Sequence, residues 1–319
     1  MSMALTMMSC CVMVAGAADP PIKPKADAAQ IDRWIAELDH DDFAVRESAT
    51  LSLAKSGVAG LPALMTAARE ASPEVRIRAT QVLAAWYARP DKDAVDAVED
   101  ALEQLRDAAG TVGDQADVTW DSQRRAREQR CLARLEELGA GIEYREDAYT
   151  VDREEPGVRN RPISHIAITP RWKGGDDGLK YIRRMRQTPL SPGFIVYRVN
   201  GNTVSAAAFQ SLEDAGHRVE KRGAKLGVGN GNGFGFNPAP VNVPGFRVES
   251  MKRDSAAEKH GLLLDDIITQ FGDKPVTDFN DLVTYLLATK PGDKVEFTVL
   301  REQKGERVTV KVTVELGDW

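Results

Sequence analysis

The chain has 319 residues, of which 42% are hydrophobic and 28% are charged, and its formal net charge is −6. This length allows two or three domains with hydrophobic cores, and the composition is typical of a water-soluble globular protein. The negative charge argues against a nucleic-acid partner, because binding a polyanion requires a basic face.

The first eighteen residues are typical of a secretory signal peptide. Residues 1–18 carry no charged side chain, and Ala15-Gly16-Ala17-Ala18 is a run of small residues that suits a cleavage site. We expect an exported protein, periplasmic or extracellular, with no stable membrane span after cleavage. Processing as a lipoprotein at Cys10 or Cys11 is the alternative. Once the segment is cleaved only Cys131 remains, so we expect no intrachain disulfide.

A proline-containing linker over 19–30 leads into a helical region predicted over 31–109. Two segments of this region, 42–54 and 72–84, match at an offset of thirty residues. Their identical pairs include Val45/Val75, Arg46/Arg76, Ala49/Ala79, Leu53/Leu83 and Ala54/Ala84. The duplication resembles HEAT-type helical repeats, which bury a continuous core by stacking on their neighbours. In such a pattern we expect Arg46 and Arg76 to bond locally between helices rather than to bind a ligand.

Residues 110–138 are interpreted as a loop followed by an amphipathic helix. The polar, glycine-containing stretch 108–117 predicts the loop, and the apolar periodicity over 122–138 predicts the helix. The helix carries several arginines that would suit a nucleic acid. Glutamates are interleaved with them and the stretch 122–138 contains no aromatic residue for base stacking, so we interpret this side of the helix as a solvated charged face.

Residues 139–220 contain a strand followed by a helix, twice. A strand-like stretch at 163–168 precedes a helix that starts at 176, and a second at 194–199 precedes a helix over 205–212. This repetition weakly resembles leucine-rich repeats, although the asparagine and the regular leucines of that repeat are largely absent. A small packed α/β connector is an equal alternative. His165 lies within the first strand, where we expect an ordinary structural histidine.

The segment 223–319 has the most specific pattern in the chain. It begins with Lys225-Leu226-Gly227-Val228 and a glycine-rich run, and continues with a turn at Gly272-Asp273 and a helix capped by Thr277 or Asp278. Two strands with alternating valines end it, joined by a turn that contains Gly305. In this order the elements resemble a PDZ domain of the bacterial, protease-associated Deg/Htr type.

The expected architecture is therefore a multidomain α+β protein. It comprises an N-terminal α-helical repeat of HEAT-like type, a small α/β connector, and a C-terminal PDZ-like β-sandwich or barrel with helices.

The resemblance to PDZ domains implies a groove between a sheet edge and a helix, where an extended peptide adds as another strand. Leu226, Gly227 and Val228 would bind the C-terminal carboxylate of the peptide through their backbone N–H groups, and Lys225 would add a positive charge. Four apolar residues of the helix would line the pocket for an apolar last side chain, unless they are simply core: Phe279, Leu282, Val283 and Leu286. The sequence departs from the family pattern at Asp265, where these domains usually place a turn glycine.

We find no catalytic or metal-binding constellation in the sequence. The glycine-rich run at 229–235 lacks the ending of a phosphate loop, and no nucleophile string of a serine hydrolase occurs. The histidines are scattered: His40, His165, His217 and His260. We therefore expect a non-enzymatic scaffold that binds a protein or peptide and needs no cofactor. An adaptor or regulatory subunit of an extracytoplasmic protease system, and a hydrolase with an unrecognised site in 139–220, are the alternatives.

Overall fold

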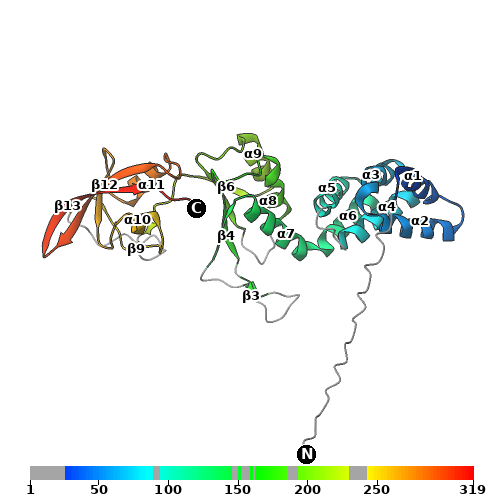
Figure 1. The fold of residues 1–319 in the computed structure, drawn as a ribbon, viewed down its shortest axis with the longest axis horizontal. Helices are drawn as coiled ribbons and strands as arrows, with labels where there is room; N and C mark the ends of the chain where they lie inside the picture. Colours follow the sequence, from blue (N-terminus) through cyan, green and yellow to red (C-terminus); the bar gives the residue numbers. More distant parts are fainter. Residues whose placement is uncertain are drawn as a thin grey trace, which may run out of the picture. The chain divides into compact units, whose positions relative to one another are not determined.

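The computed structural model describes residues 26–88, 94–145, 150–151, 159–160, 162–185, 193–229 and 243–319 (Figure 1). The chain forms two compact units, Met1–Arg124 and Arg125–Trp319. The signal peptide predicted over 1–18 and most of the glycine-rich run after Val228 lie outside the described residues. Within the described ranges no single helix is long and apolar enough to cross a membrane, although the bent pair Phe43–Ser56 and Val58–Glu70 satisfies the same test of length and composition.

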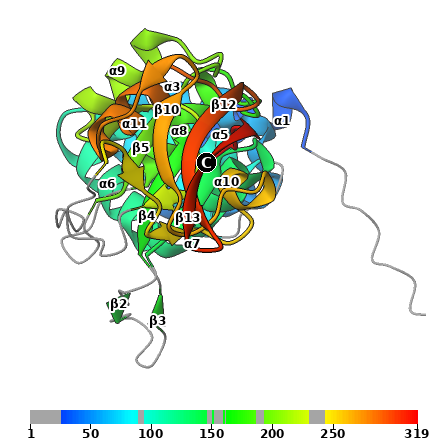
Figure 2. The ribbon, with the colours of Figure 1, turned by 90° about the vertical axis from the view of Figure 1, so that its left-hand side faces the viewer.

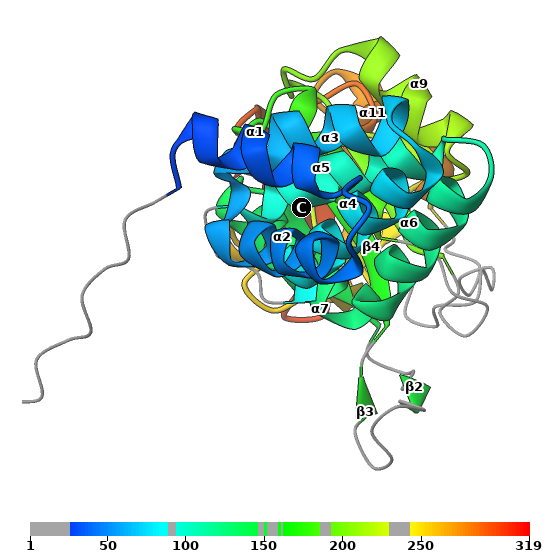
Figure 3. The ribbon, with the colours of Figure 1, turned by 90° about the vertical axis from the view of Figure 1, so that its right-hand side faces the viewer.

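The described part of the first unit consists of helices. They are α1 (Ala28–Glu37), α2 (Phe43–Ser56), the 3-10 turn η1 (Val58–Gly60), α3 (Leu61–Glu70), α4 (Pro73–Ala88), α5 (Val95–Arg106) and α6 (Thr111–Ser122). Neighbours in sequence pack as three hairpins, α1 with α2, α3 with α4 and α5 with α6, and α4 also contacts both α2 and α6 (Figure 3). One continuous apolar core runs through all six helices. The predicted helical character is confirmed, and the assignment to HEAT repeats stays a prediction.

The loop predicted over 108–117 is wrong, because α6 begins at Thr111. The glycines of this stretch suggested a loop, but Val112, Ala116 and Trp120 follow one another at intervals of four residues and all three are buried. The ring of Trp120 stacks on Tyr87 of α4 with the centroids 6.4 Å apart. Packing of this apolar stripe against α4 therefore stabilises a helix whose polar face resembled a loop. The helical array consequently extends past residue 109.

The second unit opens with α7 (Arg124–Glu137), close to the helix predicted over 122–138. Its Cys131 and Leu135 are buried in the core of the connector, the name we keep for residues 139–220. The interpretation of this helix as a solvated charged face is wrong for Arg127, which is completely buried. The guanidinium Nε of Arg127 donates to the backbone oxygen of Arg184 at 3.4 Å. The methylene stem of an arginine packs like an apolar side chain, so a helix face that carries arginine can face a core.

The connector contains a four-stranded sheet of order β1-β4-β5-β6. Its strands are β1 (Gly141–Tyr144), β4 (Ile163–Ile168), β5 (Ile195–Val199) and β6 (Arg218–Arg222). Strands β4, β5 and β6 are parallel, joined through η2 (Asp177–Leu179) with α8 (Lys180–Arg184) and through α9 (Ala206–Asp214), while β1 is antiparallel to β4. The short strands β2 (Thr150–Val151) and β3 (Arg159–Asn160) pair with each other. The predicted repetition of strand and helix is thus present, and the leucine-rich-repeat assignment stays a prediction.

The C-terminal domain, residues 223–319, is rich in strands (Figure 2). Its elements are β7 (Val228–Gly229), β8 (Phe246–Arg247), β9 (Ser250–Met251), α10 (Ala256–Lys259), β10 (Ile267–Phe271), β11 (Lys274–Pro275), α11 (Phe279–Leu286), β12 (Lys294–Gln303) and β13 (Glu306–Glu315). The larger sheet has the order β11-β10-β12-β13, with β8 also on β10, and β7 pairs with β9. All the elements predicted for the second half of this domain are present.

Local side-chain chemistry explains the turns of the C-terminal domain. The Asp278 carboxylate caps α11 by accepting from the backbone N–H groups of Asn280 and Asp281. Gly272 has a φ of +60° in the two-residue turn between β10 and β11. Asp265 has a φ of +66°, so the position where the sequence lacks the usual glycine does adopt the left-handed conformation. Aspartate tolerates this conformation better than most residues, so the turn is preserved.

Candidate functional site

The loop Leu226-Gly227-Val228, which the PDZ resemblance predicts to bind a carboxylate and which we therefore call the carboxylate-binding loop, is held by its carbonyl groups. Leu226 O accepts from Ala257 N at 3.0 Å, and Gly227 O accepts from Lys252 N at 2.9 Å. Among the described residues, the N–H groups of Leu226 and Gly227 have no hydrogen-bond partner. The loop therefore fixes its acceptors in the fold, while two adjacent N–H donors have no partner among the described residues, and such a pair of donors suits a carboxylate.

A glycine is required at position 227 of this loop. Its φ is +84°, in the left-handed region that other residues disfavour. A Cβ atom added to Gly227 would lie 2.4 Å from the Cβ of Ser255, far inside van der Waals contact. The loop therefore lies against the residue that caps α10, and the sequence pattern around Gly227 reflects a steric demand.

Helix α11 divides the four predicted groove residues into two groups. Leu282 is completely buried in the core of the C-terminal domain. Phe279 and Leu286 are half-buried against that core, and the Phe279 ring lies 5.0 Å from the Phe246 ring. Val283 is also half-buried, and it lies outside the core cluster. Leu282 is thus a core residue, whereas the other three present part of their apolar surface to solvent.

The chain segment that leads into the loop runs beside the C-terminal end of α11. A Cβ on Gly223 would lie 1.7 Å from Leu286 O, so the two backbones are in direct contact there. Ala224 N also donates to the Thr289 hydroxyl at 3.3 Å. The structure therefore places the segment that leads into the loop beside the C-terminal end of α11, and the peptide groove stays a prediction.

The third part of the candidate site is strand β7, which follows the loop. It pairs with β9 on one side, and within the described ranges no strand pairs with its other side. An exposed edge presents unpaired N–H and C=O groups, so it can accept an additional strand. The loop, this edge and the exposed side of α11 together form the candidate site.

Lys225, predicted to add positive charge beside the loop, is engaged with the connector. Its ammonium lies 3.0 Å from the Glu143 carboxylate of β1 and 4.7 Å from the centre of a Trp319 ring. The same carboxylate binds the Lys252 ammonium at 2.6 Å. Glu143 is not predictable from the sequence, because it is 82 positions from Lys225 and no local pattern links the two residues.

The Glu143 carboxylate stays ionised well below neutral pH. Burial alone would raise its pKa, but the hydrogen bonds and charges of Lys252 and Lys225 outweigh burial and lower the pKa to about 2. His165 Nε2 lies 3.4 Å from the same carboxylate, and the His165 ring is buried between Tyr197 and Trp319. Burial lowers the pKa of His165 to about 4, so this imidazole is neutral at pH 7. His165 is a buried sheet histidine, consistent with the predicted structural role.

A pocket of about 500 Å³ opens beside this cluster. Its lining includes Glu143, Lys225, Leu226, Ser255 and Trp319. The pocket therefore joins the connector, the carboxylate-binding loop and the C-terminal segment of the second unit.

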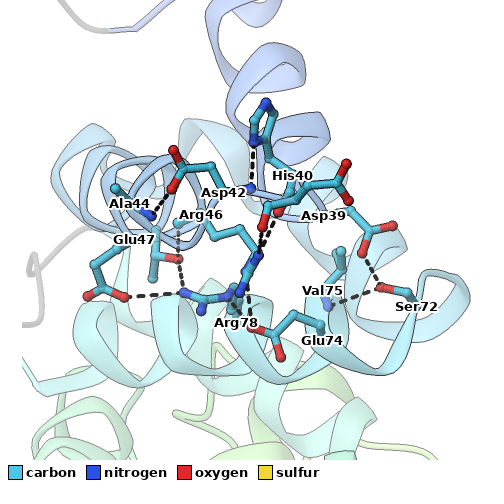
Figure 4. Close-up of polar contacts among 12 residues, drawn as sticks. Asp39, His40, Asp42, Ala44, Arg46, Glu47, Ser72, Glu74, Val75 and Arg78 are labelled. Carbon is cyan, nitrogen blue, oxygen red and sulfur yellow. Dashed lines mark hydrogen bonds and ion pairs between the residues drawn. The ribbon is translucent and has the colours of Figure 1, made fainter.

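The other candidate residues have structural roles. In the first unit the Arg46 guanidinium donates to the carbonyls of His40 and Asp41 at 2.6 and 2.9 Å, which confirms local bonding (Figure 4). The second arginine of this network is Arg78, bound to Glu74 at 2.7 Å, and not the predicted Arg76. The Nε of Arg76 is buried without a hydrogen-bond partner in the described part of the chain.

His260 also has a structural contact, because its Nδ1 lies 2.9 Å from Ala256 O. Across the described ranges, no three His, Cys, Asp or Glu side chains form a group that could hold a metal ion.

Comparison with known proteins assigns the domain that carries the site. Residues 216–312 match the family model described as a PDZ domain. This part of the chain is a PDZ domain. The matched range overlaps the predicted range 223–319 and includes the loop, β7 and α11. No curated protein matches the sequence.

Solved structures similar to this chain include HtrA-type proteases. The protease AlgW with a decapeptide is 23% identical over 36% of this chain and 35% of that chain, with a TM-score of 0.24. The serine endoprotease from Yersinia pestis is 22% identical over 37% of this chain and 38% of that chain, with a TM-score of 0.23. The chain thus spans about a third of the length of these proteins, and TM-scores below 0.5 do not establish a shared overall fold.

Proposed function

We propose that this protein is a non-enzymatic scaffold whose PDZ domain binds the C-terminal segment of a partner protein that ends in an apolar residue. The observation that carries the proposal is that, among the described residues, the adjacent N–H groups of Leu226 and Gly227 have no partner and one edge of the following strand β7 has no paired strand. Donors of this kind bind a terminal carboxylate, and the strand edge binds the peptide backbone.

The apolar surface beside the loop supports specificity for an apolar last residue. Leu286 lies at the C-terminal end of α11, beside the chain segment that leads into the loop. Val283 lies one turn earlier in the same helix. An apolar side chain buried against these residues is stabilised by about 25 cal/mol per Å² of surface removed from water, whereas a charged one would lose its hydration without a partner.

The polar cluster in the connector supports a non-enzymatic role. A general base works best with a pKa near the working pH. The pKa values of Glu143 and His165 are lowered to about 2 and about 4, so both groups are weak bases at pH 7. These two groups are therefore poor candidates for the general base of the hydrolase alternative in 139–220.

The direct test is binding of the full chain to peptides with free and amidated C-termini. Gly227→Ala places a methyl group against Ser255 and is expected to weaken binding of the free-carboxylate peptide more than tenfold. Gly261→Ala is the matched control, because its φ of +86° imposes the same backbone penalty while no atom lies within 4 Å of the added Cβ. Equal affinity for both peptide forms, or full binding by the Gly227→Ala variant, would contradict the proposal.

An adaptor role in an extracytoplasmic protease system is a finer hypothesis within the same function. It rests on the sequence resemblance to Deg/Htr-associated PDZ domains and on the export predicted from residues 1–18. Co-purification of a protease with the wild-type chain, lost in the Gly227→Ala variant, is the result expected of an adaptor.

A further inference from the structure

The connector contacts the carboxylate-binding loop through one carboxylate. Glu143 binds two lysines, and each of them is part of the structure that holds the loop. Lys225 is the residue directly before Leu226, and the backbone N–H of Lys252 donates to Gly227 O. A single side chain of β1 therefore bridges the two chain segments that position the loop.

The connector also contacts the chain just after α11. Asn200 directly follows β5, and its side-chain amide donates to Leu287 O at 2.7 Å and to Thr289 O at 2.9 Å. These carbonyls lie just after α11, where a helix leaves backbone acceptors without intrahelical partners. The amide of Asn200 thus fixes the end of the helix that carries Val283 and Leu286.

Trp319 contacts both the connector and the backbone that leads into the loop. Its indole N–H donates to Gly223 O at 2.8 Å, and its ring packs edge-on against Tyr197 of β5 at 4.9 Å. The adjacent Asp318 binds Arg171 of the connector at 2.7 Å. The backbone that leads into the loop is therefore fixed to the connector by contacts separate from those of Glu143 and Asn200.

We propose that the connector sets the spacing between the carboxylate-binding loop and the C-terminal end of α11, with Glu143 and Asn200 as positioning residues for the bound C-terminus. The proposal rests on the proposed peptide-binding function for its ligand. A groove held from both sides by one rigid sheet has less freedom to widen, so less ordering is needed when a peptide binds. Neither positioning residue contacts the peptide in this mechanism. The connector is thus part of the binding apparatus and not a spacer.

The first test measures the loop without any peptide. Hydrogen exchange of the full-length Glu143→Ala variant is expected to rise about fivefold at the amides of Lys225, Lys252 and Ala257, relative to wild type. Glu296→Ala is the matched control, because Glu296 forms an ion pair of similar length, 2.7 Å to Lys311, on the exposed β12–β13 hairpin. Unchanged exchange at these amides in Glu143→Ala would overturn the proposal. Glu143→Gln keeps one acceptor oxygen and is expected to give an intermediate increase; it replaces Glu143→Ala should that variant not fold.

The second test measures peptide binding in the same variants. If the two residues act by positioning the loop and the helix end, Glu143→Ala and Asn200→Asp each weaken binding of the free-carboxylate peptide about tenfold. The weak binding of the amidated peptide is then unchanged. Asn200→Asp replaces a donor by a carboxylate that faces two carbonyl oxygens. Gln210→Glu is its isosteric control, because the Gln210 side-chain amide also donates to an oxygen, Asp214 Oδ1 at 3.1 Å, on the exposed face of helix α9. Equal losses for both peptide forms would indicate a general loss of structure and overturn the positioning role. If wild type binds neither peptide, the proposed function fails, and the exchange measurement still decides whether the connector positions the loop.

Discussion

Replacement of Leu282 by alanine tests which residues of α11 stabilise the core of the PDZ domain and which bind the peptide. The side chain of Leu282 is completely buried, and it packs in a cluster that includes Phe246, Ile268 and Phe297. The substitution removes three carbons, each worth about 0.8 kcal/mol in transfer from water. The residual cavity adds to this loss, so we expect the free energy of unfolding of the domain to fall by about 3 to 4 kcal/mol. Such a loss is a large fraction of the stability of a typical domain, which is about 5 to 15 kcal/mol.

The measurement must report on this domain, because a chain with two units does not unfold in a single two-state step. Hydrogen exchange of the paired amides of β12 and β13 gives the free energy of opening of the sheet directly. Val283→Ala is the contrasting variant: Val283 is half-buried and lies outside the core cluster, so we expect a loss of stability below about 1 kcal/mol together with weaker peptide binding. A Leu282→Ala protein that keeps its stability but loses peptide binding would refute this division.

Two further predictions concern ion pairs and pH. Asp266 is 1% exposed and binds the Arg301 guanidinium with both oxygens, at 2.8 and 2.7 Å, which raises the pKa of Arg301. Asp266→Ala removes the carboxylate partner of that guanidinium, which among the described residues keeps only the Gly261 carbonyl as an acceptor, and should lower the free energy of unfolding in urea by about 3 to 5 kcal/mol. Loss of the exposed Glu296 pair should cost less than about 1 kcal/mol, and equal costs would contradict the assignment. The pKa of His165 is lowered from 6.5 to about 4 by burial, so the unfolded chain binds the proton more readily, and stability present above pH 6.5 is lost as the pH falls toward 4. Below pH 4.5 the lowered pKa of Glu143 acts in the same direction. The His165→Gln variant should therefore lose the fall in urea midpoint between pH 6.5 and 4 and keep the fall below pH 4.5.

The sequence by itself determined the elements whose signals are local. The alternating valines of β12 and β13 predict strands because successive side chains of a strand point to opposite faces. Asp278 predicts the start of α11 because a short acceptor side chain satisfies the first free N–H groups of a helix. The glycine at 227 and the order of elements around it indicated the PDZ domain, which the family match over 216–312 confirms.

Which residues face the core, and which distant residues meet, was decided by the tertiary structure. Leu282 and Val283 are adjacent apolar residues of one helix, and only the packing of α11 on the sheet places the first in the core and leaves the second partly exposed. In the same way, the helix at 111–122 exists because α4 covers its apolar stripe. Glu143 and Lys225 meet because the connector sheet and the PDZ domain fold as one unit. Periodicity and capping depend on near neighbours in the chain, whereas these contacts depend on how separate elements share one core.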